Sequence, residues 1–363
     1  MRVTTVYIDD DDRELKKWKR KFEDDERSKR LFKVVPINSQ KQTIDGLLSE
    51  IKTTKPELIL ADFDLSKPRN NILLGISGTT LSSAIKEKFP DIPTVLFTRR
   101  NVFNIERYSR QALSSLDDVV YKSEVFQPNR GNLSQLYELA VGFKKLRKNQ
   151  SAKWDDILKV IKVPQIDHDT LKLSNPPLSL KGNWSVSEMA EWIRNVLIKY
   201  PGILYDPIHS ATFLGLSGSE FLSEKTKEIF AKVKYSGIFA PDEGRWWKSE
   251  LRRIAISKMI KKERELPVHF GFPLALERTI KTQVGRSKCI YSGETPADWV
   301  CYILNKPVKI KYSLAYRVDS RPKVMDEARA SFKAIKTSNE VNDELFDPLG
   351  RDMLKRIRKG KTK

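Results

Sequence analysis

Residues Pro56–Asp62, PELILAD, decide the fold of the N-terminal third of the chain. Leu58–Ala61 is apolar at every position, which is typical of a strand buried on both faces of a parallel sheet, and Asp62 follows it directly. Three other segments have the same design, a short apolar run that ends in polar residues. They are VYIDDDD (Val6–Asp12), IPTVLFTRR (Ile92–Arg100) and DDVVYKSE (Asp117–Glu124).

Amphipathic helices are expected between these runs. Ile44–Ile51 carries apolar residues at i, i+3, i+4 and i+7, the spacing of one helix face. With a further strand at Phe32–Ile37, a helix near Val102–Leu113 and a last helix over Leu133–Leu146, strands and helices alternate through about 150 residues. This order predicts an α/β fold with a doubly wound, five-stranded parallel sheet, whose functional groups lie at the carboxyl ends of the strands.

Polar side chains follow four of these strands. Asp9 and Asp10 follow the first strand, Asp62 the third, Thr98 the fourth and Lys122 the fifth. Carboxylates that share one sheet edge repel one another unless a cation is present, and a cluster of carboxylates suits Mg²⁺. Lys122 can hold a phosphoryl oxygen and Thr98 can donate a hydrogen bond. The set therefore has the parts for phosphoryl transfer to a carboxylate.

In these four segments, and in their order, the sequence resembles the chemotaxis-type receiver domains of two-component response regulators. The resemblance covers residues 1–128, with the last helix reaching 148. It implies a flavodoxin-like fold, Asp62 as the phospho-acceptor, and Mg²⁺ held by Asp9, Asp10 and Asp62 with the backbone carbonyl of Asp64 as a further ligand. It also implies a switch hydroxyl at Thr98, a phosphoryl-binding lysine at Lys122 and a histidine kinase as the partner.

Three positions depart from the pattern of that family. Val119 stands where an aromatic residue is usual, and Ser123 stands where a proline is common. The stretch after Asp62, DLSKPRNNILLGISG, is longer and more polar than the short turn of the family. We expect these changes to affect aromatic-switch signalling more than metal binding or phosphorylation. Asp64 is a second candidate for the nucleophile, but Asp62 is favoured because it directly follows the apolar strand.

The rest of the chain is basic and resembles no output family. The protein has 67 Lys and Arg against 47 Asp and Glu, a net charge of +20, of which residues 1–128 carry +3. We expect a receiver at 1–148, a connector at 149–182 and a mainly α-helical output domain at 183–363 with a basic C-terminal tail. A long helix is expected over Arg245–Glu265, and its candidate nucleic-acid contacts are Lys248, Arg252, Arg253, Lys261 and Lys262. Interleaved glutamates fit an ordinary solvated helix face equally well.

Helical periodicity recurs through this region, and no catalytic motif accompanies it. Three histidines are scattered without ligand spacing, two cysteines are expected to be buried thiols, and no phosphate-binding glycine loop or G-x-S-x-G motif is present. We therefore expect a phospho-acceptor protein rather than an enzyme. Further helices are expected at Trp154–Ile161, Ser185–Leu197, Asp206–Leu216, Glu220–Val233, Pro296–Leu304, Pro322–Ile335 and Leu345–Arg358, with an extended segment at Val308–Val318.

No apolar run approaches the ~20 residues of a membrane span, and two cysteines suit a reducing compartment. We expect a cytoplasmic response regulator of a phosphorelay, with no membrane partner, that signals through its helical domain. Besides a catalytic output such as a nuclease, which ranks last, two alternatives stay open. One is a phosphate-sink or adaptor protein of a multi-component pathway, which could be defence-related. Its partner is another effector or receiver protein. The other is a DNA-binding transcriptional regulator.

Overall fold

The computed structural model describes residues 2–41, 43–65, 78–99, 116–127, 132–150, 153–177, 184–318 and 322–359. The chain forms two compact units. Unit 1 comprises Met1–Ile161, Pro177–Ile193 and Gly237–Asp242, and unit 2 comprises Lys162–Pro176, Arg194–Ser236 and Glu243–Lys363. Among the described residues, no helix is long and apolar enough to cross a membrane.

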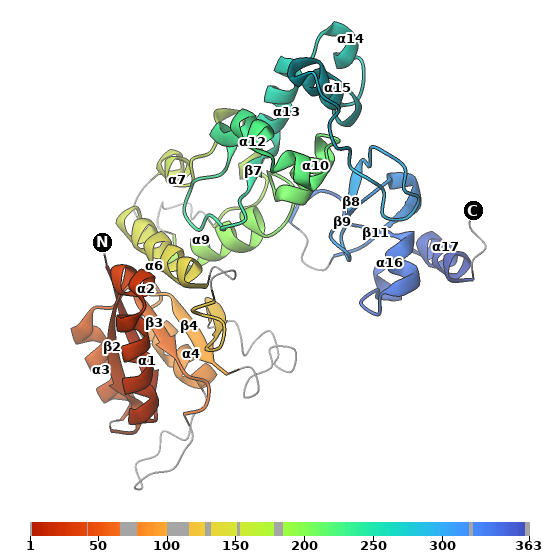
Figure 1. The fold of residues 1–363 in the computed structure, drawn as a ribbon. Helices are drawn as coiled ribbons and strands as arrows, with labels where there is room; N and C mark the ends of the chain where they lie inside the picture. The colour runs from red at the N-terminus through yellow and green to blue at the C-terminus, as the bar shows by residue number, and fades with distance from the viewer. Residues whose placement is uncertain are drawn as a thin grey trace. The chain divides into compact units, whose positions relative to one another are not determined.

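Unit 1 is built on a five-stranded parallel sheet with the order β2-β1-β3-β4-β5 (Figure 1). This is the flavodoxin-like strand order, and it confirms the expected fold class. The strands are β1 (Val3–Asp9), β2 (Phe32–Asn38), β3 (Leu58–Ala61), β4 (Thr94–Thr98) and β5 (Asp118–Tyr121). The helices are α1 (Asp12–Asp24), α2 (Glu26–Leu31), α3 (Ile44–Thr54), α4 (Gly78–Lys88), α6 (Asn132–Lys148), α7 (Trp154–Val160) and α9 (Val186–Trp192).

The two faces of the sheet bury different kinds of side chain. On one face, Val6 and Ile8 of β1 pack into an aliphatic core with residues of α3 and α4, among them Leu47 and Leu81. On the other face, Phe97 of β4 meets Tyr7, Trp18 and Phe22 in edge-on or tilted contacts, with ring centroids 5.0 to 6.2 Å apart. Because successive side chains of a strand point to opposite faces, the wholly buried β3 and β4 supply both cores.

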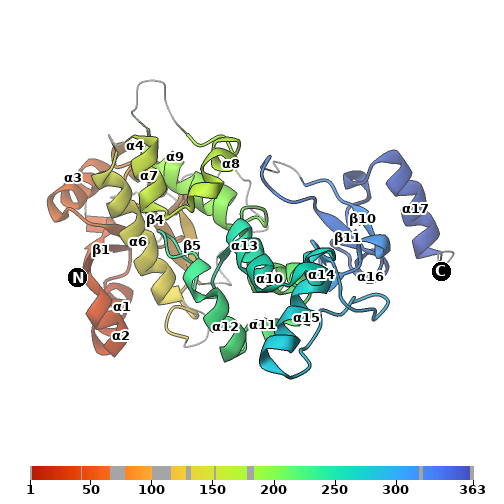
Figure 2. The same cartoon turned by 90° about the horizontal axis from the view of Figure 1, so that it is seen from above.

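Two later segments of the chain complete unit 1. Helix α9 packs on α6 (Figure 2), and Ser185 caps it by accepting a hydrogen bond from the Glu188 amide at 3.4 Å. Phe239 lies against Phe143 of α6, with ring centroids 6.0 Å apart, and a Cβ at Gly142 would stand 2.2 Å from the Phe239 ring. Glycine at 142 is therefore what lets this ring approach the helix backbone.

Unit 2 is largely helical, as expected, with short two-stranded sheets between its helices. It has two cores. One joins α10 to α15 around Phe230 and Phe272, and the other lies around Cys301 and Phe332. The helices are α8 (His168–Lys172), α10 (Pro207–Phe213), α11 (Gly218–Phe221), α12 (Glu224–Phe230), α13 (Lys248–Lys258), α14 (Lys261–Arg264), α15 (Val268–Ile280), α16 (Phe332–Thr337) and α17 (Pro348–Arg358). The strands are β6 (Leu204–Tyr205), β7 (Trp246–Trp247), β8 (Trp299–Cys301), β9 (Lys306–Val308), β10 (Ser313–Ala315) and β11 (Arg329–Ser331).

The prediction of a single long helix over Arg245–Glu265 is wrong. Trp246 and Trp247 are extended and pair with β6, because both indoles are buried in the cores of the unit. The helix that follows, α13, ends at Lys258. The Glu263 side chain then accepts a hydrogen bond from the Ile260 amide at 2.8 Å and begins the separate helix α14.

Two helices predicted from a leading proline are also corrected. Pro296–Leu304 contains β8, and a turn in which Asn305 adopts a φ of 45° returns the chain into β9. Within Pro322–Ile335, helix α16 begins only at Phe332, because the Ser331 hydroxyl accepts from the Ala334 amide at 3.1 Å and so caps the helix there.

Of the other expected helices of this region, α7, α9, α10 and α17 are present with shorter bounds. The single helix expected at Glu220–Val233 is instead two helices, α11 and α12, of which α11 begins at Gly218. The expected helix at Val102–Leu113 lies outside the described residues. The expected boundaries at 148 and 182 treat the chain as a linear series, whereas the contacts of the structure interleave the two units along the chain. They stay predictions about where the chain divides into domains.

Candidate functional site

The carboxyl ends of β1, β3, β4 and β5 enclose a small cavity in unit 1. Its volume is ≈ 60 Å³, and it is lined by every site residue predicted for the receiver together with three neighbours. The predicted residues are Asp9, Asp10, Asp62, Asp64, Thr98 and Lys122, and the neighbours are Asp11, Glu14 and Arg99. The parallel register explains the gathering: Ile8 pairs with Ala61, and Thr98 pairs with Tyr121, so the residues that follow these pairs meet at one edge.

Lys122 is the centre of the cluster. Its Nζ lies 2.7 Å from Oδ1 of Asp62 and 3.1 Å from Oδ2 of Asp9. The lysine side chain is 5% exposed, and the two carboxylates are 14% and 4% exposed. A single ammonium therefore joins two buried carboxylates, and this ion pair is screened far less than one at the surface.

Tyr7 completes the network from beneath. Its hydroxyl donates to Oδ2 of Asp9, and its ring lies 5.5 Å from the Lys122 ammonium. Burial, followed by the charge of Asp9, raises the pKa of Tyr7 far above its ordinary value, so the phenol stays a hydrogen-bond donor. Sequence reasoning missed Tyr7, although strand alternation places residue 7 on the same side of β1 as Asp9.

Thr98 presents an unsatisfied hydroxyl. The residue is 1% exposed, lines the cavity, and its Oγ1 has no hydrogen-bond partner among the described residues. A buried polar group without a partner costs about 1–3 kcal/mol. The arrangement therefore suits a further acceptor in the cavity, such as an oxygen of an anionic group.

The surroundings of Asp62 change the pKa of its carboxyl group. Burial raises its pKa; Lys122 acts in the opposite direction, and the nearby Asp9 raises the pKa again, so the net shift is upward. The Asp64 amide donates to Oδ2 of Asp62 at 3.3 Å. A carboxyl group whose pKa is perturbed by burial and by identified neighbouring charges is a candidate functional group.

Glu14 and Arg99 close one side of the cavity. Arg99 lies 2.9 Å from Glu14, and Glu14 also accepts from Lys17 and from the Trp18 indole at 2.9 Å. Burial acts to raise the pKa of Glu14, but these donors outweigh it and lower the pKa to about 2. Neither residue was predicted, because Arg99 directly follows Thr98 and Glu14 lies four residues after Asp10 without a pattern that marks either one.

The donor set fits Mg²⁺ in kind. Mg²⁺ prefers oxygen ligands, keeps several waters and is commonly bound through one or two carboxylates, and Asp9, Asp10 and Asp62 supply carboxylates at one edge. Among the described residues, no group of three or more His, Cys, Asp or Glu is arranged to hold a metal ion. Within the cluster the Lys122 ammonium contacts both Asp9 and Asp62.

The predicted nucleic-acid contacts do not share one helix. Lys248 is tied to Asp326, with its Nζ 2.7 and 3.0 Å from the two carboxylate oxygens, and Arg253 pairs with Glu250 at 2.6 Å. Arg252 is exposed on α13, and Lys261 and Lys262 are exposed on α14. The stripe of cations that a continuous helix would present is thus divided between two helices.

Comparison with solved structures finds receiver domains over the N-terminal two fifths of the chain. The response regulator TrrA from Thermotoga maritima, in complex with Mg²⁺ and BeF, is 18% identical; the match covers 38% of this chain and 99% of that one, with a TM-score of 0.28. A receiver domain from Clostridium thermocellum is 17% identical over 40% of this chain and 98% of its own, with a TM-score of 0.30. The anti-anti-sigma factor PhyR from Bartonella quintana is 18% identical over 41% and 51%, with a TM-score of 0.28.

No protein-family model and no curated protein matches the chain. The fold of unit 1 is therefore assigned from its own strand order and register.

Proposed function

We propose that the protein is a response regulator whose unit 1 accepts a phosphoryl group on Asp62. The observation that carries this proposal is the cavity in which the Lys122 ammonium touches Asp62 and Asp9 while the buried Thr98 hydroxyl lacks a partner. These are a nucleophile, a cation and a hydrogen-bond donor, placed around a space that suits a small anion.

In the proposed reaction a carboxylate oxygen of Asp62 attacks the phosphorus of a phosphohistidine. The P–N bond breaks, the imidazole leaves with the electron pair of that bond, and a mixed anhydride forms on Asp62. Lys122 and the Thr98 hydroxyl then bind phosphoryl oxygens, which satisfies the Thr98 donor. Mg²⁺ bound at Asp9, Asp10 and Asp62, with the Asp64 carbonyl, would neutralise charge on the transferring group.

The partners follow from this chemistry. The donor is a histidine kinase, and unit 2 is the output, whose affinity for its target must differ between the two phosphorylation states if a signal is to pass. A sink or adaptor role and DNA binding are both compatible with phosphorylation of Asp62. None of the described contacts favours one of these outputs over the others.

The decisive experiment is phosphorylation of the full-length protein by acetyl phosphate with Mg²⁺, followed by intact mass. The wild type should gain one acid-labile phosphoryl group, and Asp62→Asn should gain none. Asp64→Asn, two residues further along the same loop, is the matched control and should still be labelled. Labelling of Asp62→Asn, or its loss only in Asp64→Asn, would contradict the assignment.

A further inference from the structure

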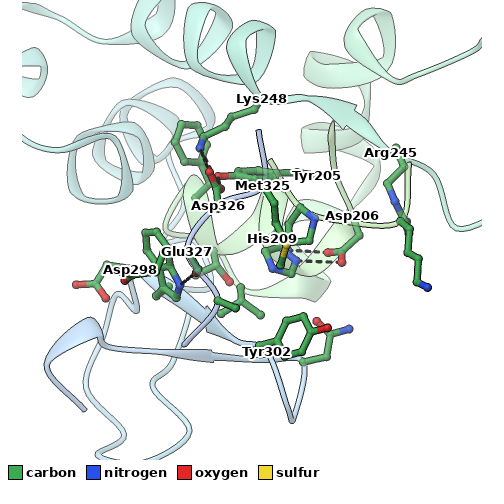
Figure 3. Close-up of a pocket in the computed structure, with 18 of the residues that line it drawn as sticks. Tyr205, Asp206, His209, Arg245, Lys248, Asp298, Tyr302, Met325, Asp326 and Glu327 are labelled. Atoms are coloured by element: carbon green, nitrogen blue, oxygen red, sulfur yellow. Dashed lines mark hydrogen bonds and ion pairs between the residues drawn. The ribbon is translucent and has the colours of Figure 1, made fainter. Parts of the chain in front are cut away.

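Unit 2 contains a cavity of ≈ 600 Å³ that the receiver chemistry does not use. Its walls come from segments far apart in the sequence: β6 and α10, the start of α13, the β8–β9 hairpin and residues 325–328 (Figure 3). Pockets of about 300–1,000 Å³ are the usual size for small organic ligands. The cavity is thus about ten times the volume of the one at Asp62.

Aromatic rings form much of the wall. Tyr205 is 5% exposed, and its ring packs 5.7 Å from Phe213, with its hydroxyl on Asp326. Trp299 is fixed by a 3.1 Å hydrogen bond from its indole to the Glu327 carbonyl. Tyr302 stands on the other side of the opening with 39% of its surface exposed. The exposed ring of Tyr302 offers a stacking surface for a planar ligand, whereas Tyr205, with the Lys248 ammonium 5.0 Å from its ring, is a buried part of the wall.

An aspartate–histidine pair lies inside the pocket. Nδ1 of His209 is 3.0 Å from Oδ2 of Asp206, and the His209 amide donates to Oδ1 of the same carboxylate at 2.8 Å. Burial acts to raise the pKa of Asp206, but the hydrogen bonds from His209 outweigh it and lower the pKa. The ionised carboxylate thus fixes the ring, and Nε2 has no partner among the described residues.

The charged side chains that line the pocket differ in which groups they pair with. Asp326 is neutralised by Lys248, and Glu327 by Arg329. Arg245 donates from Nε to the Ile198 carbonyl at 3.1 Å and pairs through Nη1 with Glu243 at 3.0 Å, which leaves its Nη2 group for a ligand, and Lys199 is an exposed residue that lines the pocket. Arg245 lies beside Asp206 and His209, on the opposite side of the pocket from Asp298 (Figure 3). The side with His209 is therefore the one suited to an anion.

A second observation indicates that the pocket is made for a ligand. Thr212, on the same helix as His209, lines the cavity and is 1% exposed, and its hydroxyl has no partner among the described residues. Such groups are rare in folded proteins because each costs about 1–3 kcal/mol. A polar ligand atom reaching this wall would remove that cost.

We propose that this pocket binds a nucleoside monophosphate, with the base stacked on the exposed ring of Tyr302 and the phosphate bound by Lys199, Arg245 and His209. The exposed ring of Tyr302 accepts a base through its face, and the Nη2 group of Arg245 can donate to phosphate. Unit 2 is then a ligand-sensing output, and its ligand would tune what phosphorylation of unit 1 controls.

The test is calorimetric titration of the full-length protein with AMP, GMP, CMP and UMP in turn. At least one should bind, and adenosine or guanosine without phosphate, and ribose 5-phosphate without base, should each bind at least tenfold more weakly. Tyr302→Ala should weaken binding by about 5- to 100-fold, the range expected for one base–aromatic contact, and Lys199→Ala should weaken the monophosphate but leave the nucleoside unchanged.

Matched controls separate the pocket from general effects. Phe270→Ala removes an aromatic ring of similar exposure, 37%, outside the pocket, and Lys232→Ala removes an exposed lysine of η5 (Ala231–Val233); neither should change affinity. Asp62→Asn should also bind normally, so failure of the receiver assignment is distinguishable. Absence of binding by all four monophosphates at about 1 mM, or unchanged affinity in both Tyr302→Ala and Lys199→Ala, would overturn the proposal.

Discussion

The two units each contain a lysine, an aspartate and a buried tyrosine in the same local arrangement. In unit 1 Lys122 pairs with Asp9, and Tyr7 donates to Asp9 while its ring lies 5.5 Å from the ammonium. In unit 2 Lys248 pairs with Asp326, and Tyr205 donates to Asp326 while its ring lies 5.0 Å from the ammonium. These groups will be called the receiver cluster and the pocket cluster.

The two clusters differ in the number of their carboxylates and in how far the lysine is exposed to water. In the receiver cluster a second carboxylate, Asp62, shares the same ammonium, and the lysine is 5% exposed. In the pocket cluster one carboxylate takes both contacts, and the lysine is 35% exposed. The first cluster has an excess of negative charge that a metal ion can balance, and the second is already neutral. The same three side chains thus stand beside a second carboxylate in one place and form a neutral ion pair in the other.

The largest expected difference concerns loss of the lysine. Lys122→Met leaves two buried carboxylates without a cation and should lower the free energy of opening of β1 by about 3 kcal/mol. Lys248→Met exposes Asp326 to water and should cost about 1 kcal/mol or less. Native-state hydrogen exchange of the β1 and β6 amides measures each effect in its own unit. Equal losses would show that the two clusters do not differ as described.

Magnesium should act on the receiver cluster alone. At ten times its dissociation constant, a ligand of the folded state stabilises it by about 1.4 kcal/mol. We expect Mg²⁺ to slow hydrogen exchange in β1 correspondingly, and EDTA to reverse this. Asp9→Asn should abolish the response, whereas Asp326→Asn, the equivalent change in the pocket cluster, should keep it. A response that survives in Asp9→Asn would move the metal elsewhere.

Replacing the extra carboxylate should make the receiver cluster resemble the pocket cluster. Because the pKa of Asp62 is raised in the folded protein, its ionisation opposes folding as the pH rises above about 4, the pKa of an unfolded aspartate. Asp62→Asn should therefore stabilise unit 1 at pH 7, and the gain should vanish toward pH 3. Unfolding by urea at several pH values checks this, with Asp64→Asn as the control; a gain that persists at pH 3 would contradict it.

The smallest effect is expected at Glu14, beside the receiver cluster. Its pKa is lowered from 4.5 to about 2, so its ionised form stabilises the fold above about pH 4.5, and this contribution disappears as the pH falls toward 2. Glu14→Gln should cost about 1 kcal/mol or less at pH 7 and nothing at pH 2. Glu23→Gln, an exposed partner in a 3.8 Å pair on the same helix, should change little at either pH in the same urea titrations.

The receiver cavity could be predicted from the sequence because one rule places its residues. Each of Asp9, Asp62, Thr98 and Lys122 ends an apolar strand or directly follows one, and parallel strands bring those ends to one edge. The rule does not predict which side chains form ion pairs within the cavity. That Lys122 would lie between Asp9 and Asp62 depends on side-chain positions that strand ends alone do not specify.

The pocket of unit 2 could not be predicted in this way. Its cluster joins Lys248 to Asp326, 78 residues later, and local signals, helical periodicity for Lys248 and a leading proline for Asp326, predict helices at both residues. Lys248 instead follows the buried strand of Trp246 and Trp247. Asp326 precedes β11, where α16 was expected to have begun already. Short strands paired over long separations leave too few residues for a period of two to be read.

The ring of Phe239 over Gly142 has a consequence for synthesis of the protein. Helix α6 ends at Lys148, yet the side chain that covers it leaves the ribosome only after residues 149–238 have been made. At the usual speed of translation this takes roughly 5–20 s. During that interval the nascent α6 lacks this ring, and the apolar surface that Phe239 later covers beside Phe143 is open to solvent.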